Sequence, residues 1–230
     1  MNITERDRRV VSKLAAARWL TTSQISALCF AGVTPEMARR RIRLLREARY
    51  IRSVQSNMMA EALHTLGSRG PELLSGERVQ RIRLERALPK NLSHLTGINQ
   101  IRIAVERTAR EDGVTLGFFF ASWELQAHGW KLPRIPDAAC RVELGATSTT
   151  ALFEYDRGEE RPSYLLQTKF ARYRDSLAGF PFSRVVVVAE TDELRDRLQA
   201  YLGKHLPASV FSFVAKGALI GSWSVSELLP

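Results

Sequence analysis

The sequence predicts an α+β winged helix-turn-helix followed by a mixed-sheet α/β domain, and three observations support that prediction. The chain has 230 residues, which is enough for two small domains. Its first part carries three capped helical patterns and then two short strand-like runs. Its second part alternates helical and strand-like patterns in the order α-β-β-β-α-β-α-β. We therefore expect a winged helix in residues 1–70, a linker or short helix in residues 71–90 and an α/β domain in residues 91–230.

Each of the first three helices begins at a capping signal. A threonine just before a helix can accept a hydrogen bond from the first-turn backbone, and an acid or amide three residues later can return one. Proline is favoured at the first helical position because an N–H there would have no partner within the helix. By these rules the three helices start at Thr4 with Asp7, at Thr21 with Gln24, and at Thr34 with Pro35.

The third of these helices is rich in arginine. Its apolar residues lie on one side, and Arg39, Arg43 and Arg46 share another side, because residues three and four apart are helical neighbours. In a winged helix the third helix lies in the DNA major groove, so the arginines nearest its start, Arg39, Arg40 and Arg43, are candidates for contacts with base edges. A solvated helix face is the alternative. The predicted DNA-binding residues are Arg39, Arg40, Arg41, Arg43, Arg46, Arg49 and Arg52.

The positive charge is concentrated in the first part of the chain. The formal net charge is +10. Residues 1–90 contain 18 Lys and Arg against 8 Asp and Glu, whereas residues 91–230 contain 16 of each kind. A polyanion should therefore bind to the first part of the chain. We expect double-stranded DNA as that partner.

Hydropathy and cysteine usage indicate a cytoplasmic protein. The sequence has no apolar run long enough to span a membrane and no signal peptide, so we expect neither a membrane protein nor a secreted one. Cys29 and Cys140 lie far apart in apolar contexts, which favours two buried thiols over a disulfide. Such cysteine usage is typical of a reducing compartment.

Three carboxylates mark the ends of two predicted strands in the second domain. The stretch Arg134–Gly158 is typical of a β-hairpin, in which one strand opens at Asp137 and the next ends with Glu154 and Asp156. Glu154 and Asp156 point to the same face because they are two residues apart on a strand. Carboxylates at strand ends are also common as solvated groups. The hairpin therefore has two interpretations: a divalent-metal site or a hairpin with solvated ends.

The metal interpretation assigns a role to each charged residue. Hydrolysis of a phosphodiester with Mg²⁺ needs oxygen ligands that converge on the metal, and a cation that holds or polarises the attacking water. Asp137 and Glu154 would be the metal ligands, and Lys169, on the next predicted helix, would be the cation. Glu124, at the end of the preceding predicted strand, would be a further ligand or an orienting group. With Mg²⁺ as the expected cofactor, the candidate catalytic residues are Asp137, Glu154, Asp156, Lys169 and Glu124.

Several segments together resemble one protein family. They are TERDRRVVSKLAAARWLTTSQISALCF, ARRRIRLLREARYIR, HLTGINQIRIAVERTARE, WELQ, IPDA, and FEYDRG with a lysine further on. Over most of the chain, from about residue 4 to about residue 175, they resemble the replication-relaxation family. That family comes from bacterial plasmids and other mobile elements, and its members begin with a winged helix. The second half of the chain also resembles the PD-(D/E)xK restriction-endonuclease-like fold.

The second resemblance implies a metal-dependent nuclease core or a degenerate descendant of one. By motif position, Asp137 matches the acid that follows proline, and Glu154 matches the next acid. The sequence departs from the motif at Asp156, where an active member usually carries the lysine. Lys169 on the following helix could replace that lysine, because the fold tolerates such a migration.

Three functions are consistent with the sequence. The first is a double-stranded DNA-binding protein that acts in replication, relaxation or transcriptional control, with a degenerate second domain that serves for homodimerisation or partner contact. The alternative is a Mg²⁺-dependent endonuclease that its winged helix targets. The third is an accessory factor that recruits a relaxase or replication protein through its neutral half.

Overall fold

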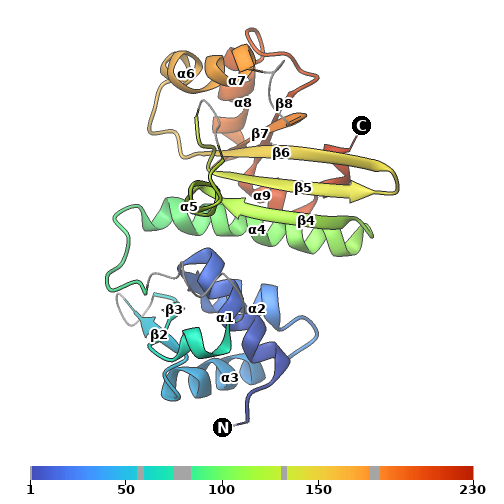
Figure 1. Cartoon of the computed structure of the whole chain (residues 1–230). Helices are drawn as coiled ribbons and strands as arrows, with labels where there is room; N and C mark the ends of the chain where they lie inside the picture. Colours follow the sequence, from blue (N-terminus) through green and yellow to red (C-terminus); the bar gives the residue numbers. More distant parts are fainter. Residues whose placement is uncertain (1, 56–59, 75–83, 131–133, 177–181, 230) are drawn as a thin grey trace. The chain divides into compact units, whose positions relative to one another are not determined.

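The computed structural model describes residues 2–55, 60–74, 84–130, 134–176 and 182–229 (Figure 1). The chain divides into two compact units, Met1–Asn99 and Gln100–Pro230, and the division lies within the helix α4, Leu92–Glu111. A further helical pattern that the sequence favours in the linker, at Val79 and Ile82, lies outside the described residues. Each unit is described by itself below.

The first unit opens with three helices, and the predicted capping signals are confirmed. Thr4 and Thr21 each accept a hydrogen bond from the first-turn backbone, and the side chains of Asp7 and Gln24 return one. Thr34 caps the third helix, whose first residue is a proline. The helices are α1 Glu5–Ala17, α2 Thr22–Cys29 and α3 Pro35–Glu47.

A small antiparallel sheet completes the first unit. Its three strands are β1 Leu20–Thr21, β2 Ile51–Val54 and β3 Leu63–Leu66, in the order β1-β3-β2. The predicted hairpin after the third helix is therefore confirmed. The sequence analysis missed β1, because a strand of two residues has no periodic pattern. A short 3₁₀ helix, Gly70–Leu73, follows the hairpin.

The second unit is built on a five-stranded mixed sheet. The strand order is β4-β5-β6-β7-β8. β5 runs antiparallel to both β4 and β6, whereas β7 runs parallel to both β6 and β8. The predicted four-valine strand is fully buried, as a central parallel strand should be. The strands are β4 Thr115–Ala121, β5 Ala138–Leu144, β6 Thr147–Asp156, β7 Arg184–Ala189 and β8 Phe211–Ala215.

Helices flank this sheet, and one of them corrects the sequence prediction. The strand expected to run through Trp123 ends at Ala121, so Glu124 lies in the first turn of the helix α5, Ser122–Ala127, and not at a strand end. The carboxylate of Glu124 accepts a hydrogen bond from the backbone N–H of Ala121, which favours a helix start here. The remaining helices are α6 Pro162–Leu165, the π-helix Leu166–Phe170, α7 Ala171–Ser176, α8 Asp192–Leu202, α9 Lys216–Gly221 and the 3₁₀ helix Val225–Leu228.

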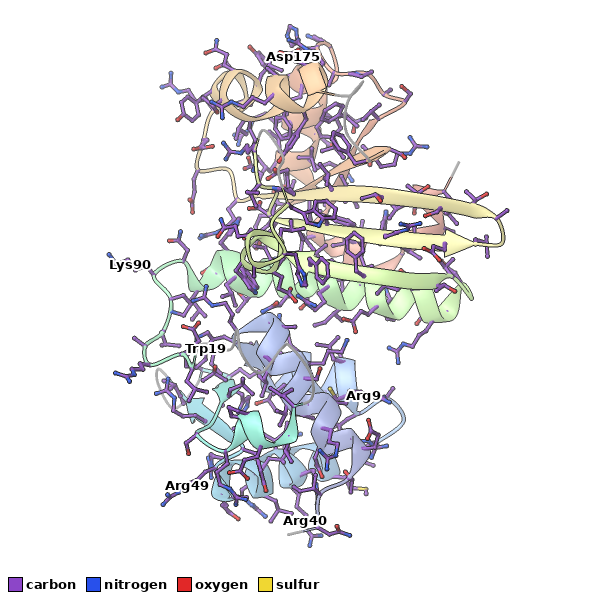
Figure 2. All side chains as sticks on the ribbon, viewed as in Figure 1. Arg9, Trp19, Arg40, Arg49, Lys90 and Asp175 are labelled. Carbon is purple, nitrogen blue, oxygen red and sulfur yellow. The ribbon has the colours of Figure 1, made fainter. Side chains whose placement is uncertain are left out.

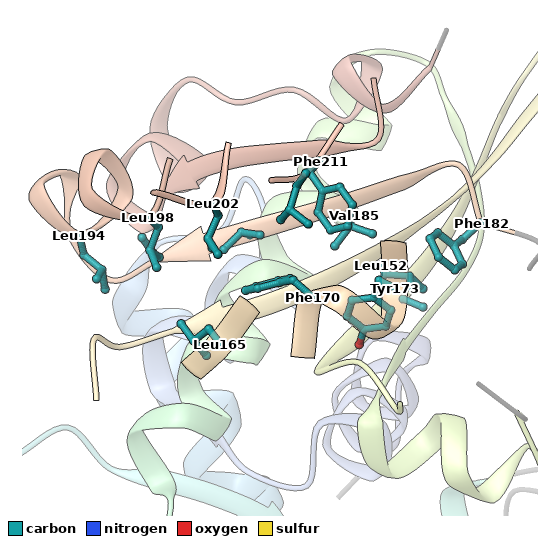
Figure 3. Close-up of a cluster of buried hydrophobic side chains, with 14 of the residues drawn as sticks. Leu152, Leu165, Phe170, Tyr173, Phe182, Val185, Leu194, Leu198, Leu202 and Phe211 are labelled. Atoms are coloured by element: carbon teal, nitrogen blue, oxygen red, sulfur yellow. The ribbon is translucent and has the colours of Figure 1, made fainter. Parts of the chain in front are cut away.

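An apolar core fills one face of the second sheet (Figure 3). Side chains of the segment 162–176 and of α8 pack there against alternate residues of β6, β7 and β8, which is the pattern that a strand period of two predicts. The buried thiols Cys29 and Cys140 are confirmed, and within the described part of the chain neither forms a disulfide. Among the described helices, none is at once long enough and apolar enough to span a membrane.

Candidate functional site

Three of the predicted site residues meet at one face of the second sheet. The ammonium group of Lys169 forms an ion pair with Glu154 and lies 3.7 Å from the Oδ2 atom of Asp137. Glu154 is almost fully buried, and Lys169 is nearly so. We call these three side chains the acid–lysine cluster. They lie far apart in the sequence, so their convergence is a property of the tertiary structure.

The pairing of β5 with β6 brings the two acids together. Ala138 pairs with Phe153, so Asp137, just before β5, lies beside Glu154. The backbone N–H of Tyr155 donates a 2.8 Å hydrogen bond to the Oδ2 atom of Asp137, which fixes the carboxylate at the entry to β5. The pairing of β5 with β6 therefore holds side by side the two acids that the sequence placed in one hairpin.

A π-helical turn carries the lysine into the cluster. Leu166–Phe170 is a π-helical turn, in which each hydrogen bond spans five residues instead of four: the N–H of Ala171 donates to the carbonyl of Leu166. Such turns are frequent at functional sites because they redirect side chains without ending the helix. Lys169 lies in this turn.

Tyr173 belongs to this site, although the sequence analysis did not include it among the site residues. Its hydroxyl group donates a hydrogen bond to the Oε1 atom of Glu154, while Lys169 pairs with Oε2. Figure 3 shows Tyr173 at the edge of the apolar core, with its oxygen pointing away from the neighbouring apolar side chains. The one sequence signal for this role was its spacing, four residues after Lys169, which is one helical turn.

The electrostatics of the cluster follow from burial and from the ratio of two acids to one ammonium group. Burial raises the pKa of Glu154, Lys169 lowers it, and the negative charge of Asp137 raises it again, so that the net shift is upward. Burial lowers the pKa of Lys169, but both acids more than offset it, so that the lysine stays charged. With all three groups ionised the cluster carries one excess negative charge.

The donor set of the cluster is compatible with a hard divalent cation. Carboxylate oxygens are preferred Mg²⁺ ligands, and Asp137 and Glu154 both direct an oxygen toward Lys169. Within the described ranges no group of three or more His, Cys, Asp or Glu could hold a metal ion. Two carboxylates are thus the acidic ligands that this cluster can offer.

The structure engages Glu124 and Asp156 elsewhere. Glu124 forms an ion pair with the buried guanidinium of Arg102, besides its bond to the start of α5. The Oδ1 atom of Asp156 accepts a 2.6 Å hydrogen bond from the N–H of Gly158 and so holds the turn after β6. Arg102 was absent from the sequence prediction, because nothing in a helical pattern marks one arginine as buried.

The predicted DNA-binding arginines fall into two groups. Five of the seven are exposed to solvent on α3 or just after it, and those on α3 lie away from the buried Ala38, Ile42 and Leu45. Figure 2 shows two of them, Arg40 and Arg49, extending outward. The exposed group is Arg39, Arg40, Arg43, Arg46 and Arg49.

The other two arginines have partners within the first unit. Arg41 donates a 2.7 Å hydrogen bond to the buried carboxylate of Asp7 and so links α3 to α1. Arg52 donates to the carbonyl of Glu85, at 2.8 Å, and its guanidinium lies over the ring of Trp19. These contacts give both side chains a structural role, which a helical or strand pattern alone does not reveal.

Comparison with known proteins gives one match. The family model described as Replication-relaxation matches residues 12–184, which covers most of the chain and parts of both units. No curated protein and no solved structure matches the chain.

Proposed function

The chain belongs to the replication-relaxation family, and we propose that it acts in plasmid replication as a double-stranded DNA-binding protein. The observation that carries this proposal is the exposed arginine side of α3. The order of three helices followed by a hairpin is that of a winged helix-turn-helix, in which the third helix enters the major groove. We therefore assign DNA contact to the five exposed arginines.

Three features support this assignment. Arg39, Arg43 and Arg46 lie on one side of α3, which spaces their charges along one groove of a duplex. Among the described residues, Arg40, Arg46 and Arg49 form no ion pair, so no carboxylate must be displaced before they meet a phosphate. The excess positive charge of the whole chain lies in its first 90 residues. Arg41 and Arg52 are left out of the proposed surface because they are engaged within the unit.

The experiment measures duplex binding by fluorescence anisotropy between about 50 and 200 mM salt. The Arg40→Ala/Arg43→Ala variant should bind a mixed-sequence duplex roughly tenfold more weakly. The log–log salt slope should fall by about one for each of the two arginines that contacts a phosphate, because each lost phosphate contact removes about one released counterion.

An Arg107→Ala/Arg110→Ala variant on α4 controls for the loss of net charge, and it should bind as the native protein does. An unchanged affinity for the α3 variant, or an equal loss in the α4 control, would remove α3 from the interface.

The acid–lysine cluster favours a second candidate function, a Mg²⁺-dependent endonuclease. The second unit runs α4-β4-α5-β5-β6, then the helical segment 162–176, then β7. Asp137 and Glu154, the two acids of the restriction-endonuclease-like motif that the sequence resembles, lie beside each other just before β5 and on β6. Lys169 supplies the positive charge that the motif lysine would provide at the position of Asp156. Asp137 and Glu154 would hold the metal, which would activate water and neutralise charge at the phosphate. Lys169 would hold a positive charge beside the two carboxylates, and Tyr173 would keep Glu154 in place.

Cleavage of supercoiled plasmid with Mg²⁺ or Mn²⁺ tests this second candidate. The native protein should nick or linearise the plasmid, and an Asp137→Ala/Glu154→Ala variant should lose that activity while it still binds duplex DNA. An Asp192→Ala/Glu193→Ala variant, at the exposed start of α8, is the matched control for two lost acids. If neither the native protein nor its control cleaves, while DNA binding is intact, the second unit is a scaffold for homodimerisation or for contact with a relaxase or replication protein.

A further inference from the structure

Four aromatic rings form a stack at the edge of the second sheet. Phe118 and Phe120 of β4 stack with their ring centroids 4.8 Å apart, and the ring of His128 stacks on Phe120 at 4.4 Å. Trp130 meets Phe118 edge-on at 5.6 Å. We call Phe118, Phe120, His128 and Trp130 the β4 ring column.

The ring column lies on the same face of the sheet as the acid–lysine cluster. Phe120 pairs with Ala139, and Ala139 pairs with Leu152, so that these three side chains point to one face. Asp137 and Glu154 each lie two residues further along, which returns a side chain to that face. Phe118, Phe120 and Trp130 also pack at the margin of the apolar core of this face. Asp137 therefore precedes the strand next to β4, two residues along from the partner of Phe120, and Glu154 lies one strand further away.

Exposure distinguishes the ring column from the ordinary core. Phe119, between two of its members, points to the opposite face and is 6% exposed. Phe118, Phe120 and Trp130 are only partly buried, and His128 is exposed. Among the described strands, β4 lies at the edge of its sheet. A column of aromatic rings that stays accessible at a sheet edge is a surface on which flat groups can stack.

Two cationic side chains belong to this face of the sheet. Arg141 pairs in register with Phe118; its side chain is 50% exposed and forms an ion pair with Glu143 at the surface. Arg134 lies near the acid–lysine cluster, where its charge lowers the pKa of Tyr173 against the stronger upward effect of burial. Aromatic rings near positive charges are the combination by which proteins bind single-stranded nucleic acid, since bases stack and phosphates pair with the cations.

We propose that the β4 ring column binds unpaired bases of a DNA strand and so presents a single-stranded segment to the acid–lysine cluster. The proposal rests on the proposed action of this protein on DNA, and it deepens it: α3 holds the duplex, and the ring column holds an opened strand. Base stacking tolerates any sequence, so the column should not select one.

The experiment measures binding of the full chain to a fluorescent oligothymidine, with a mixed-sequence duplex as the parallel ligand. A Phe118→Leu/Phe120→Leu variant should bind the oligothymidine about 5- to 100-fold more weakly, because base stacking is lost. A His128→Ala variant, which removes the exposed ring of the column, should show a smaller loss in the same direction. Both should bind the duplex as the native protein does.

Matched controls separate this proposal from the proposed duplex binding. Phe119→Leu changes the same strand on its opposite face and should leave oligothymidine binding unchanged. Arg40→Ala/Arg43→Ala should weaken duplex binding and spare the oligothymidine. Native affinity for the oligothymidine in both ring-column variants would overturn the proposal, as would an equal loss in the Phe119 control. If only the α3 variant lost oligothymidine binding, the ring-column proposal would be overturned, but the proposal that α3 binds duplex DNA would stand.

Discussion

His64 is a buried histidine that bridges two hydroxyl groups in the first unit. Its Nε2 atom lies 2.9 Å from the hydroxyl of Thr22 at the start of α2, and its Nδ1 atom lies 2.8 Å from that of Ser53 on β2. Burial lowers the pKa of His64 to about 4, with Arg46 adding to the shift and Glu61 opposing it. The ring therefore stays neutral in the folded state and ties the small sheet to a helix.

This histidine should make the stability of the protein depend on pH. Its folded-state pKa is about 4 and its ordinary value is 6.5, so the unfolded state takes up the proton first as the pH falls. The stabilisation is complete above pH 6.5 and is lost progressively between pH 6.5 and 4. A shift of this size corresponds to roughly 3 kcal/mol of unfolding free energy.

Urea denaturation between pH 4.5 and 7.5 measures the effect. A His64→Gln variant keeps a hydrogen-bonding side chain but cannot titrate, so its unfolding free energy should fall less steeply with acid than that of the native protein. Identical pH slopes for the two proteins would show that His64 takes no part in the dependence.

At the scale of elements, one ion pair links the helix that carries the basic surface to the rest of the first unit. Arg41 of α3 pairs with Asp7 of α1 and also donates to the carbonyl of Asn2. Burial would raise the pKa of Asp7, but hydrogen bonds from Arg41 and Thr4 hold it below its usual range. The same carboxylate closes the capping box of α1, so one side chain serves the start of α1 and the position of α3.

Replacing Asp7 with alanine should lower the free energy of unfolding by about 2–4 kcal/mol, because it removes a cap and leaves the arginine without its buried partner. Chemical denaturation gives the value. Glu36→Ala removes an exposed partner of Arg39 on α3 and should cost less than about 0.5 kcal/mol. A similar small loss for Asp7→Ala would mean that the pair does not hold α3.

At the scale of the whole molecule, charge and chemistry are divided between the two units. The first carries the basic helix, and the second carries the acid–lysine cluster and the ring column. Under the proposals above, the first unit binds duplex DNA and the second unit acts on it.

We expect the protein to be a homodimer, because two copies related by a two-fold axis would match a two-fold symmetric DNA site. Sedimentation equilibrium should then give twice the chain mass of 25.9 kDa at micromolar concentration. A single-chain mass that persists when a duplex with an inverted repeat is added would contradict the expectation.

Much of the fold could be predicted because its signals are local. Caps at Thr4, Thr21 and Thr34, the valine run of β7 and the alternation in β5 and β6 are each set by neighbours in the chain. Errors arose where the signal was short or ambiguous. β1 is too short to show a periodic pattern. The apolar run before Glu124 is typical of a strand, and only the hydrogen bond from Ala121 to Glu124 shows that the helix α5 has already begun.

The sequence by itself determined the three capped helices of the first part, the basic third helix, the buried valine strand and the buried cysteines, and it pointed to the acids through a resemblance to a nuclease motif. Only the tertiary structure decided which charged side chains act together. It brought Lys169 to Glu154, directed Glu124 to Arg102, turned Arg41 inward to Asp7, and aligned the rings beside the cluster. The physical reason is that capping and periodicity depend on residues a few positions apart, whereas ion pairing and stacking depend on strand register and helix packing between distant segments.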